Sequence, residues 1–424
     1  MSQKLQAVRG MNDVLPADSA AWQHLHAVAA EVFAAYGYGE LRLPVVERTE
    51  LFKRAVGEVT DVVEKEMYSF EDRGGENLSL RPELTAGVVR AGIEHGLLYN
   101  QQQRVWCTGP VFRYERPQAG RYRQFHQLDV EAFGIATPDI DVEVIAIAAQ
   151  LWRRLGVSGF TLQINSLGTP ESRAAYRAAL IEYLGKYESS LDEDSRRRLG
   201  TNPLRVLDSK VPATREITAG APRLLDHLDA ASAAHFEAVQ RGLSDLGLAF
   251  TINQRLVRGL DYYTHTVFEW TTTQLGAQDA VCAGGRYDGL VQQLGGPPTP
   301  GVGFGLGIER LIALMRLQEA PVPNNAPHVY FCRFGESAEA AALKLAEGLR
   351  QELPRLRLAL NAGGGGLKSQ LKRADGSGAR YALVLGDDEA ARSTVQVKSL
   401  RGEGEPFNCP WNELPAQLVR LLTL

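Results

Sequence analysis

The chain has 424 residues, 44% hydrophobic and 23% charged, with a formal net charge of −4. This is an ordinary globular composition that excludes wholesale disorder, the length suits two or three domains, and the small negative charge argues against a general nucleic-acid coat protein. No run approaches the roughly 20 apolar residues of a membrane helix and no basic segment leads into an apolar run at the N-terminus, so we expect a cytoplasmic protein without membrane contact.

The first third of the chain predicts a helix followed by strands. Apolar residues recur at helical spacing from Ala20 to Ala35. The segment from Glu40 to Val46 alternates as a strand that Pro44 interrupts, and proline fits an edge or an interface better than a central ladder. Residues 101–134 and 255–307 have period two with many aromatic and branched side chains, which predicts antiparallel sheet.

The remainder of the chain predicts an insertion, a linker and a second domain. Residues from Thr169 to Gly242 are helical and charged, and Pro321 to Pro327 has the composition of a linker. Beyond the linker, apolar strands alternate with helical runs, which indicates a small α/β domain with a largely parallel sheet. The expected organisation is a discontinuous sheet domain, a helical insertion, a linker and a C-terminal domain, at residues 1–168 with 243–320, 169–242, 321–327 and 328–424.

One polar stretch, VFRYERPQAGRYRQFHQLDVEAFG from Val111 to Gly134, gathers unusual side chains. In two strands joined by a loop, its odd-numbered positions share one face, because side chains alternate along a strand. They combine arginines, carboxylates and an aromatic ring, which suits a site for an anion, a cation and a flat base: Arg113, Glu115, Arg123, Phe125, Gln127, Asp129 and Glu131. A merely solvated polar face is the alternative.

A second constellation is GVGFGLGIERLIALM, from Gly301 to Met315. Its glycines recur every second residue, so one strand face lacks side chains and we expect something flat or bulky to lie against it. The spacing does not match the dinucleotide-binding glycine pattern. Arg310, in the first turn of the following helix, is placed to meet a phosphate, although an ordinary surface arginine is the alternative.

These two stretches resemble the second and third signature motifs of the class II aminoacyl-tRNA synthetases, about 200 residues apart. Two further segments, LVRGLDYYTHTVFEW from Leu256 and AGGRYDGLV from Ala283, look like the blocks peculiar to histidyl-tRNA synthetases of bacterial type. The resemblance spans essentially the whole chain. It implies an α/β protein: an α+β catalytic domain on a mixed, mainly antiparallel sheet, with a helical insertion and a C-terminal α/β anticodon-binding domain.

The resemblance also implies a reaction and its partners. The enzyme would activate L-histidine with ATP to histidyl-adenylate plus pyrophosphate, then transfer histidine to the 3′ end of tRNA(His). Mg²⁺ would bridge the outer phosphates of ATP, and we expect no protein-held metal and no tightly bound cofactor. The expected assembly is a homodimer, with the first helix and the Pro44 strand at the interface.

By position, the resemblance implies an ATP site of four arginines, a carboxylate and an aromatic ring: Arg113, Arg121, Arg123, Arg310, Glu115 and Phe125. Arg113 would hold the α-phosphate, and Arg310 the γ-phosphate and one face of the base. Glu115 and Phe125 would bind the adenine by a hydrogen bond and by stacking. The other two arginines would assist at the phosphates, whose oxygens match the forked donors of guanidinium groups.

The implied histidine pocket consists of polar and aromatic side chains, namely Glu83, Thr85, Gln127, Glu131, Arg258, Tyr262, Tyr263 and Tyr287. The first three would bind the ammonium group, Glu131 with Tyr263 the imidazole, and the other two tyrosines would line the pocket. Leu84 stands where relatives often have a small or polar residue. Since Leu84 points away from Glu83 and Thr85, we expect the packing to change and the ammonium site to survive.

Arg258, assigned to the histidine carboxylate, and Arg113 are the expected catalytic residues. The carboxylate attacks the α-phosphorus in line, and negative charge builds on phosphate oxygens as pyrophosphate leaves. A fixed cation stabilises this charge and orients the two anions. A surface salt bridge between Arg258 and Asp261 is the alternative.

For tRNA, the resemblance assigns the acceptor end to Arg116 and Gln118 and the anticodon to the tail domain. The tail segment GGGGLKSQLKRAD places Lys368 and Lys372 four residues apart on one helix face, with Arg373 alongside. This basic face suits phosphate contact, and a solvated face is the alternative. The glycine run lacks the ending of a phosphate-binding loop, so we expect no nucleotide site there.

The cysteines and histidines suggest no metal chemistry. The four cysteines lie far apart, as core or surface thiols would, at Cys107, Cys282, Cys332 and Cys409. The eight histidines have no ligand spacing, and we expect a structural role for His126 on the sheet face opposite Gln127.

Two other readings compete with this one. The first is the histidine-sensing regulatory subunit of ATP phosphoribosyltransferase, a non-catalytic relative that predicts eroded ATP-site arginines and no anticodon domain. Arg113, Arg258, Arg310 and the long tail argue against it. The second is a class II synthetase for another amino acid or a free-standing amino-acid ligase, which would lack the two blocks at Leu256 and Ala283.

Overall fold

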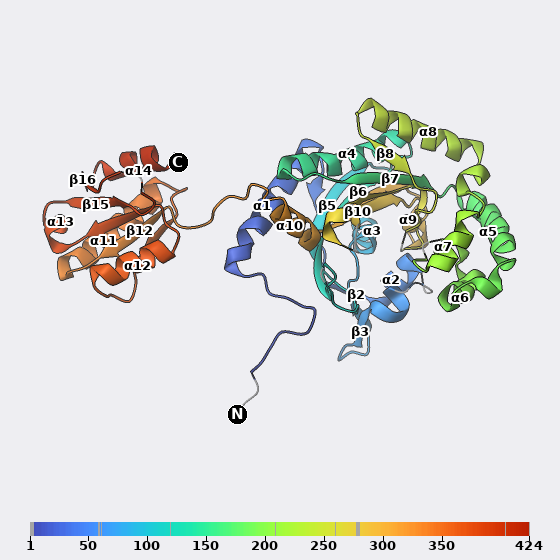
Figure 1. Ribbon diagram of the computed structural model, residues 1–424, viewed down its shortest axis with the longest axis horizontal. Helices are drawn as coiled ribbons and strands as arrows, with labels where there is room; N and C mark the ends of the chain where they lie inside the picture. Colours follow the sequence, from blue (N-terminus) through green and yellow to red (C-terminus); the bar gives the residue numbers. More distant parts are fainter. Residues whose placement is uncertain are drawn as a thin grey trace. The chain divides into compact units, whose positions relative to one another are not determined.

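The computed structural model describes residues 4–57, 60, 62–118, 120–207, 209–258, 260–276, 280–402 and 404–423. The chain divides into two compact units, residues 1–322 and 323–424, each with its own hydrophobic core (Figure 1). None of the helices in the described part of the chain is long and apolar enough to cross a membrane.

The first unit is built on an eight-stranded sheet of order β1-β5-β6-β11-β10-β9-β7-β8. Its strands are β1 (Gly39–Glu40), β5 (Gln103–Phe112), β6 (Gln124–Phe133), β7 (Thr161–Ser166), β8 (Phe250–Ile252), β9 (Thr264–Thr271), β10 (Ala280–Arg286) and β11 (Gly301–Gly307). The outermost pairs, β1 with β5 and β7 with β8, run parallel, and the pairs between them are antiparallel. The predicted mixed, mainly antiparallel sheet is confirmed.

Four of the described helices cover one face of this sheet: α1 (Pro16–Ala35), α4 (Pro138–Leu155), α8 (Ala230–Asp245) and α10 (Ile308–Leu317). Proline at position 16 suits the start of α1, where its missing N–H needs no partner. The apolar residues of α1 face the core, as their spacing predicts. Helix α8 belongs to this layer although it lies inside the predicted insertion, because Phe236, Val239 and Leu243 pack into the same core as α4.

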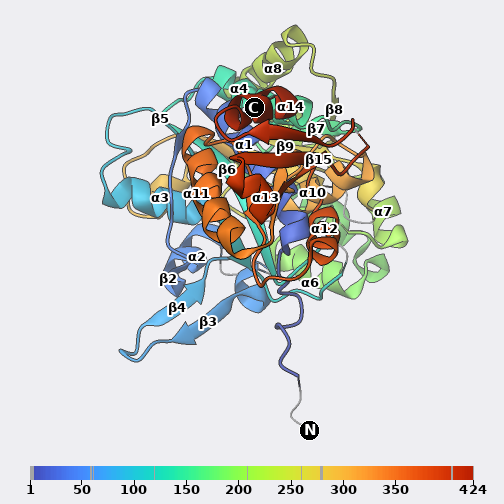
Figure 2. The same ribbon diagram turned by 90° about the vertical axis from the view of Figure 1, so that its left-hand side faces the viewer.

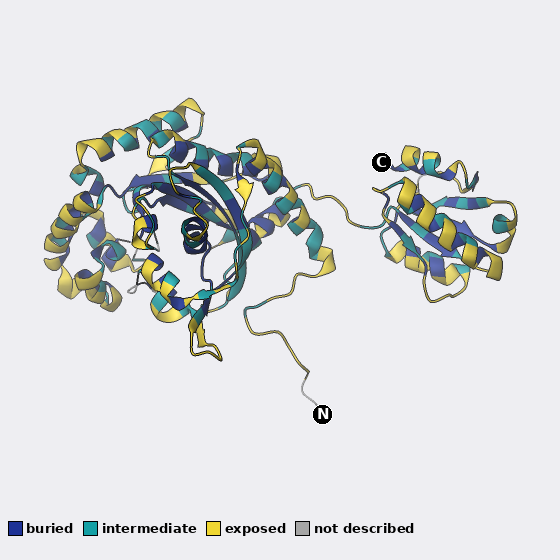
Figure 3. Cartoon of the chain, turned by 180° about the vertical axis from the view of Figure 1, so that it is seen from behind, coloured by how far each residue is buried: buried dark blue, intermediate teal, exposed yellow. Residues whose placement is uncertain are grey.

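The opposite, concave face of the sheet holds shorter elements: α2 (Thr49–Val56), η1 (Val62–Glu66), α3 (Thr85–Glu94), α9 (Leu290–Gln293), and a three-stranded sheet of β2 (Val46–Arg48), β4 (Asn77–Leu80) and β3 (Tyr68–Glu71). Helix α3 is buried along most of its length inside the curve of the large sheet (Figure 3). Strands β3 and β4 form a hairpin at the periphery of the first unit (Figure 2). The concave face is therefore where a site can form between sheet and helix.

The predicted strand from Glu40 to Val46 is wrong. The chain instead forms β1 and β2, which belong to different sheets, with Pro44 in the irregular segment between them. The carbonyls of Leu43 and Pro44 accept hydrogen bonds from Arg81 Nη1 at 3.0 and 3.1 Å, so a side chain takes the place of a neighbouring strand. Proline removes the donor that a continuous strand would need here.

A helical segment follows β7, as predicted. It contains α5 (Pro170–Gly185), η2 (Glu188–Ser190), α6 (Glu193–Thr201), η3 (Pro203–Val206), α7 (Pro212–Ala219) and η4 (Leu224–His227). Thr169 and Asp192 cap α5 and α6 by accepting the backbone N–H of Ser172 and Ser195. The apolar side of this segment joins the core on the concave face of the sheet.

The second unit has a five-stranded sheet of order β13-β12-β14-β15-β16, formed by β12 (Val329–Arg333), β13 (Leu358–Leu360), β14 (Tyr381–Leu385), β15 (Thr394–Ser399) and β16 (Phe407–Pro410). Its helices are α11 (Glu336–Glu352), α12 (Leu367–Gly376), α13 (Asp387–Ala391) and α14 (Leu414–Leu422). Strands β13, β12 and β14 are parallel, but β15 and β16 run antiparallel, so the prediction of a largely parallel sheet is only partly right. The connections before β15 and β16 are too short for a parallel crossover, which needs about a dozen residues.

Candidate active site

A cavity of about 300 Å³ opens on the concave face of the eight-stranded sheet. It lies between β6, β10 and β11, the starts of α3 and α10, and the segments after β5 and before β9. Eleven of the sixteen predicted site residues line it: Glu83, Thr85, Arg113, Glu115, Arg121, Phe125, Gln127, Arg258, Tyr262, Tyr263 and Arg310. The fold therefore brings together residues that are more than 200 positions apart in the sequence.

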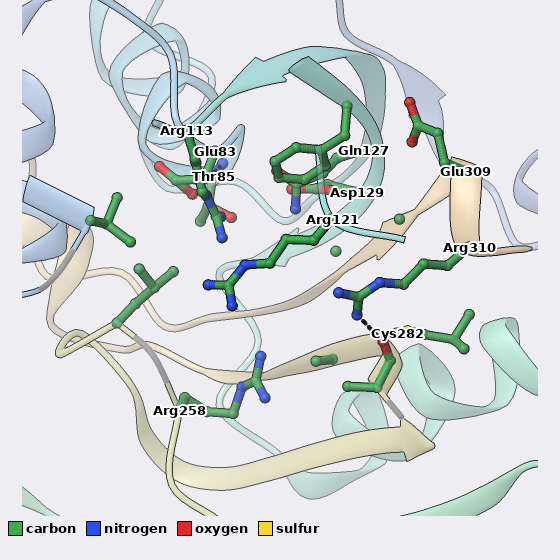
Figure 4. A pocket seen from close by; sticks show the side chains of 18 of the residues that line it. Glu83, Thr85, Arg113, Arg121, Gln127, Asp129, Arg258, Cys282, Glu309 and Arg310 are labelled. Atoms are coloured by element: carbon green, nitrogen blue, oxygen red, sulfur yellow. Dashed lines mark hydrogen bonds between the residues drawn. The ribbon is translucent and has the colours of Figure 1, made fainter. Parts of the chain in front are cut away.

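Four arginines from three parts of the chain extend into this cavity. Figure 4 shows Arg113, Arg121, Arg258 and Arg310 arranged around one common space. A low-dielectric cleft lined by charges of one sign concentrates its field and attracts ligands of the opposite sign. This part of the cavity is consequently suited to a polyanion.

Two of these arginines are oriented by backbone carbonyls. Arg113 Nε donates to Pro82 O at 2.9 Å, and its guanidinium lies 5.3 Å from the centre of the Phe125 ring. Arg310 donates from Nε to Gly120 O at 3.1 Å and from Nη1 to Ala280 O at 2.5 Å. Carbonyl acceptors fix the direction of a guanidinium, so these bonds orient both side chains.

Arg121 is oriented differently, because its guanidinium forms an ion pair with the carboxylate of Glu115. Glu66 lies 4.0 Å from Arg121 Nη2 on the other side. The predicted phosphate-binding arginine and the predicted adenine-binding carboxylate are thus paired with each other.

The other end of the cavity is acidic. Glu83, Asp129 and Glu131 are all at most 3% exposed. Burial raises the pKa of each carboxyl group, and their mutual repulsion adds to the rise for Asp129 and Glu131. A positively charged ligand group would relieve this repulsion, so the acidic end is suited to a cation.

Hydrogen bonds hold these carboxylates in place around the start of α3. Glu83 accepts the backbone N–H groups of Thr85 and Ala86 at 2.9 and 2.8 Å, which satisfies two unpaired donors at the helix start. Glu131 accepts from Thr85 Oγ1 at 2.6 Å and from Tyr287 Oη at 2.5 Å. Glu131 and Tyr287 therefore form the supporting wall of the pocket rather than its lining.

Three buried acceptor atoms at the cavity have no hydrogen-bond partner among the described residues: Glu115 Oε2, which has Arg121 as an ion-pair partner, Gln127 Oε1 and Asp129 Oδ1. All three side chains line the cavity. A buried acceptor without a donor is costly unless a ligand or water supplies one. These atoms thus indicate where a ligand with N–H groups would bind.

The chain matches the family model described as "Histidyl-tRNA synthetase" over residues 10–311, and the model described as "Anticodon binding domain" over residues 322–421. It is 55% identical over 423 residues to a protein from Halorhodospira halophila named histidine–tRNA ligase, covering 100% of both chains.

The chain belongs to the histidyl-tRNA synthetase family.

Solved structures agree with this membership. The apo histidyl-tRNA synthetase of S. aureus is 34% identical and has a TM-score of 0.83, covering 98% of this chain and 100% of that chain. A structure from Bacillus halodurans C, described as an ATP phosphoribosyltransferase regulatory subunit/histidyl-tRNA synthetase, is 23% identical with a TM-score of 0.67, covering 91% of this chain and 99% of that one, and shows the shared fold. The chain is thus an aminoacyl-tRNA ligase in class, and the regulatory alternative is not favoured.

The prediction for the glycines of the third family motif holds for one half of the strand. Gly305 and Gly307 line the cavity, so the strand is open to a ligand there. A Cβ at position 303 would lie 1.6 Å from Glu131 Oε2, and one at position 301 would lie 2.4 Å from the Tyr287 ring. The space above the first half of the strand is therefore filled by side chains of β6 and of the segment after β10.

Arg123 does not line the cavity. Strand β5 ends at Phe112 and β6 begins at Gln124, so Arg113 and Arg123 lie in the connection, where strand alternation does not apply. The Arg123 guanidinium lies 4.0 Å from the centre of the Tyr114 ring and faces a separate hollow, which Arg116 also lines. Its assignment to the ATP phosphates stays a prediction that needs the loop to move.

The two residues assigned to the acceptor end of tRNA also lie outside the cavity. Arg116 is in the hollow beside Tyr114, and Gln118 forms an isolated bridge with Arg121, with N–O distances of 3.0 and 2.9 Å. Gln118 thus connects this loop to a cavity arginine. The tRNA contact of both residues stays a prediction.

The partner of Arg258 was not found from the sequence. Arg258 Nη1 donates to Glu269 on β9, while Asp261 accepts from Asn202 Nδ2 at 3.2 Å, so the alternative of an Arg258–Asp261 salt bridge is wrong. The signal available in the sequence is a single carboxylate within the apolar run Val267–Trp270. Pairing it with Arg258 requires the course of the intervening loop.

Other predicted details can be placed. His126 has a structural position on the helix-covered face: its backbone N–H donates to Glu309, and its Nδ1 lies 2.9 Å from Glu309 Oε1. Leu84 is fully buried in the core under α3. Within the described ranges, no three His, Cys, Asp or Glu side chains gather in a way that could hold a metal ion. The four cysteines are buried thiols.

Proposed function

We propose that the chain joins L-histidine to tRNA(His), with ATP as the second substrate of a first, activating step. The observation that carries this proposal is one cavity that combines four arginines with buried carboxylates. An amino acid presents an ammonium group to the carboxylates and a carboxylate to the arginines, next to the phosphates of ATP. The family membership supplies the reaction that such a cavity serves.

Histidine binds with its ammonium group among Glu83, Thr85 and Gln127, where buried carboxylates and a lone Gln127 acceptor need a cation with N–H donors. Its imidazole binds against Tyr263 and Glu131, with Tyr262 and Tyr287 around it. Analogues that cannot donate to these acceptors leave buried groups unpaired, which can reduce reactivity by about 10⁴-fold or more. This polarity gives selectivity for histidine.

ATP binds across the arginine end, and it enters with Mg²⁺ on its outer phosphates. Arg113 binds the α-phosphate, Arg310 the γ-phosphate, and Phe125 stacks on the adenine. The Arg121–Glu115 pair separates as ATP enters, because its two members bind the phosphates and the adenine respectively. Exchange of one carboxylate partner for several phosphate oxygens keeps Arg121 paired throughout.

The activating step is an in-line displacement at the α-phosphorus. A carboxylate oxygen of histidine forms a bond to phosphorus, and the bond from phosphorus to the bridging oxygen breaks, so that pyrophosphate leaves with the electron pair. Arg258 and Arg113 hold the two anions together and stabilise the charge on the phosphate oxygens. Removing one such preorganised group commonly costs about 10²- to 10³-fold in rate.

In the second step the terminal ribose hydroxyl of tRNA(His) loses its proton and attacks the carbonyl carbon of the histidyl-adenylate. The ester bond forms as the bond from that carbon to the phosphate oxygen breaks, and AMP leaves. Arg116 and Gln118 contact the acceptor end, and the tail unit reads the anticodon with Lys368 and Lys372 exposed on α12. Arg373 is engaged within the tail, since its Nε donates to Asn361 Oδ1 at 3.1 Å and its Nη2 to Gly364 O.

The finer organisation is also part of the proposal. The protein acts as a cytoplasmic homodimer, with α1 and the Pro44 segment at the interface. Its domains are residues 1–168 with 243–320, 169–242, the linker 321–327, and 328–424. Helix α8 falls largely within the 169–242 domain, but it packs on the sheet of the catalytic domain.

The direct test is charging of tRNA(His) with labelled histidine. Acid-precipitable label that requires both ATP and histidine, and that no other amino acid replaces, is the expected result. A folded protein that binds histidine but charges no tRNA would instead support the regulatory alternative.

A further inference from the structure

Glu269 occupies an unusual place on the central sheet. It lies on β9, between β10 and β7, with Ala283 and Gln163 opposite it in the two neighbouring strands. Its neighbours Phe268 and Trp270 belong to the core under the helices, so by strand alternation Glu269 faces the concave side. A carboxylate here is unexpected in an apolar strand, and its side chain is only 20% exposed.

Glu269 pairs with Arg258. The carboxylate accepts a hydrogen bond from Arg258 Nη1, and the Arg258 side chain is 18% exposed. Burial lowers the pKa of Arg258, and the Glu269 charge together with the Tyr263 and Tyr262 hydroxyls more than offsets this effect. The ion pair is thus partly desolvated, where charge-assisted hydrogen bonds are strong and directional.

Besides Glu269, Arg258 has the Tyr263 ring beside it, at 6.0 Å from its guanidinium. The described residues between β8 and β9 form neither helix nor strand, so the backbone of Arg258 is not held in a regular element. Its Nε is buried without a hydrogen-bond partner among the described residues. Glu269, in contrast, is fixed in the middle of the sheet with hydrogen-bonded strands on both sides.

We propose that Glu269 is a positioning residue for the activating step, which holds Arg258 by one edge of its guanidinium so that the remaining N–H groups face the cavity. This role rests on the proposed function. Figure 4 shows the Arg258 guanidinium directed into the space that Arg121 and Arg310 also face. Preorganisation of this kind matters because a fixed donor need not reorient as charge develops.

The principal competing role is structural: a half-buried ion pair that only stabilises the fold. The two roles differ in a measurable way. A positioning residue acts through Arg258, so its removal changes the rate of activation only while Arg258 is present. A structural residue lowers thermal stability and affects activity in both backgrounds by the same factor.

The experiment measures histidine-dependent pyrophosphate exchange in wild type, Glu269→Gln, Arg258→Ala and the double variant, with kcat, the KM for histidine and the melting temperature of each. The Gln side chain is isosteric and keeps an acceptor but not the charge. We expect Glu269→Gln to lower kcat by about 10- to 100-fold. In the Arg258→Ala background we expect the same substitution to change kcat by less than about twofold.

A matched control is the ion pair between Arg104 on β5 and Glu143 on α4. The two side chains are 3.0 Å apart, they are 33% and 28% exposed, and neither lines the cavity. Glu143→Gln removes the charge from a comparable ion pair and should leave kcat within about twofold of wild type.

Two results would overturn the role of Glu269. One is an unchanged kcat in Glu269→Gln; the other is an equal loss in both Arg258 backgrounds, which would assign Glu269 to the fold. An absence of exchange in the wild type would instead remove the proposed function, and this role with it. Glu269→Ala is a stronger truncation. If it fails to fold, the isosteric Glu269→Gln variant still distinguishes the positioning role from the structural one.

Discussion

The hydroxyl of Tyr287 donates to Glu131 Oε2 at 2.5 Å, joining the segment after β10 to the buried end of β6. Thr85 Oγ1 donates to the other carboxylate oxygen at 2.6 Å. Glu131 thus accepts from two elements that are distant in sequence, and it fixes the wall of the proposed imidazole pocket. Its burial raises the pKa of Glu131 to about 8, although both hydrogen bonds act to lower it.

The raised pKa of Glu131 predicts a pH-dependent stability. Between pH 4.5, the ordinary pKa of the group, and about 8, the folded protein binds the proton more tightly than the unfolded chain. The contribution of Glu131 to the free energy of unfolding is therefore fully present below pH 4.5 and is lost as the pH rises through about 8. We expect the melting temperature of wild type minus that of Glu131→Gln to fall between pH 5 and pH 9, measured without ligand by fluorescence. A constant difference in melting temperature across this range would show that Glu131 is ionised throughout.

Gly303 should tolerate no side chain, because a Cβ there would fall 1.6 Å from Glu131 Oε2. Gly303→Ala must displace a doubly hydrogen-bonded, buried carboxylate, and we expect a loss of about 1–3 kcal/mol or more in the free energy of unfolding. Weaker histidine binding, measured by calorimetry, should accompany it. The matched variant is Gly39→Ala in β1, whose Cβ would meet nothing within 4 Å. Equal behaviour of the two variants would mean that the wall can rearrange without cost.

A buried ion pair fixes the first unit behind the site. Arg286 Nη2 lies 2.5 Å from Asp141 Oδ2, and both side chains are at most 1% exposed. Removing one partner leaves a buried charge, so Asp141→Asn should cost about 3–5 kcal/mol in urea unfolding. The exposed pair Arg197–Asp194, at 2.9 Å, provides the control, and Asp194→Asn should cost under about 1 kcal/mol. A small effect of Asp141→Asn would indicate that water reaches the pair.

The basic face of α12 predicts a separation between the two steps of the reaction. Replacing Lys368 and Lys372 by Ala should raise the KM for tRNA(His) by about three- to tenfold, since each removes a phosphate contact, and should leave pyrophosphate exchange unchanged. The change should shrink at high salt. Lys344→Ala, on the exposed side of α11, is the control. An unaltered KM for tRNA(His) would make this face an ordinary solvated one.

The sequence was most informative where the structure is local or periodic. The helix over residues 20–35 and the strands β5, β6 and β9 to β11 follow from spacing, and Arg310 lies in the first turn of its helix as expected. The motif resemblance also selected eleven side chains that line one cavity, although no local pattern could show that residues around 83, 127, 258 and 310 meet.

The features that could not be predicted from the sequence depend on contacts between distant segments. The glycines of β11 predict bare space, but only the register with β6 shows that Glu131 fills part of it. Pro44 predicts an interruption of the strand, but only the structure shows that Arg81 binds the backbone carbonyls at this interruption. The pairing of Arg258 with Glu269 likewise depends on the path of an irregular segment that no periodicity describes.

The most direct test of the central claim is histidine-dependent exchange of labelled pyrophosphate into ATP, with wild type and Arg258→Ala measured side by side and the other nineteen amino acids as controls. The account predicts exchange with histidine alone, reduced by at least about a hundredfold in the variant, because a preorganised cation is lost from the step that releases pyrophosphate. A folded wild type that binds histidine yet exchanges no pyrophosphate would contradict it.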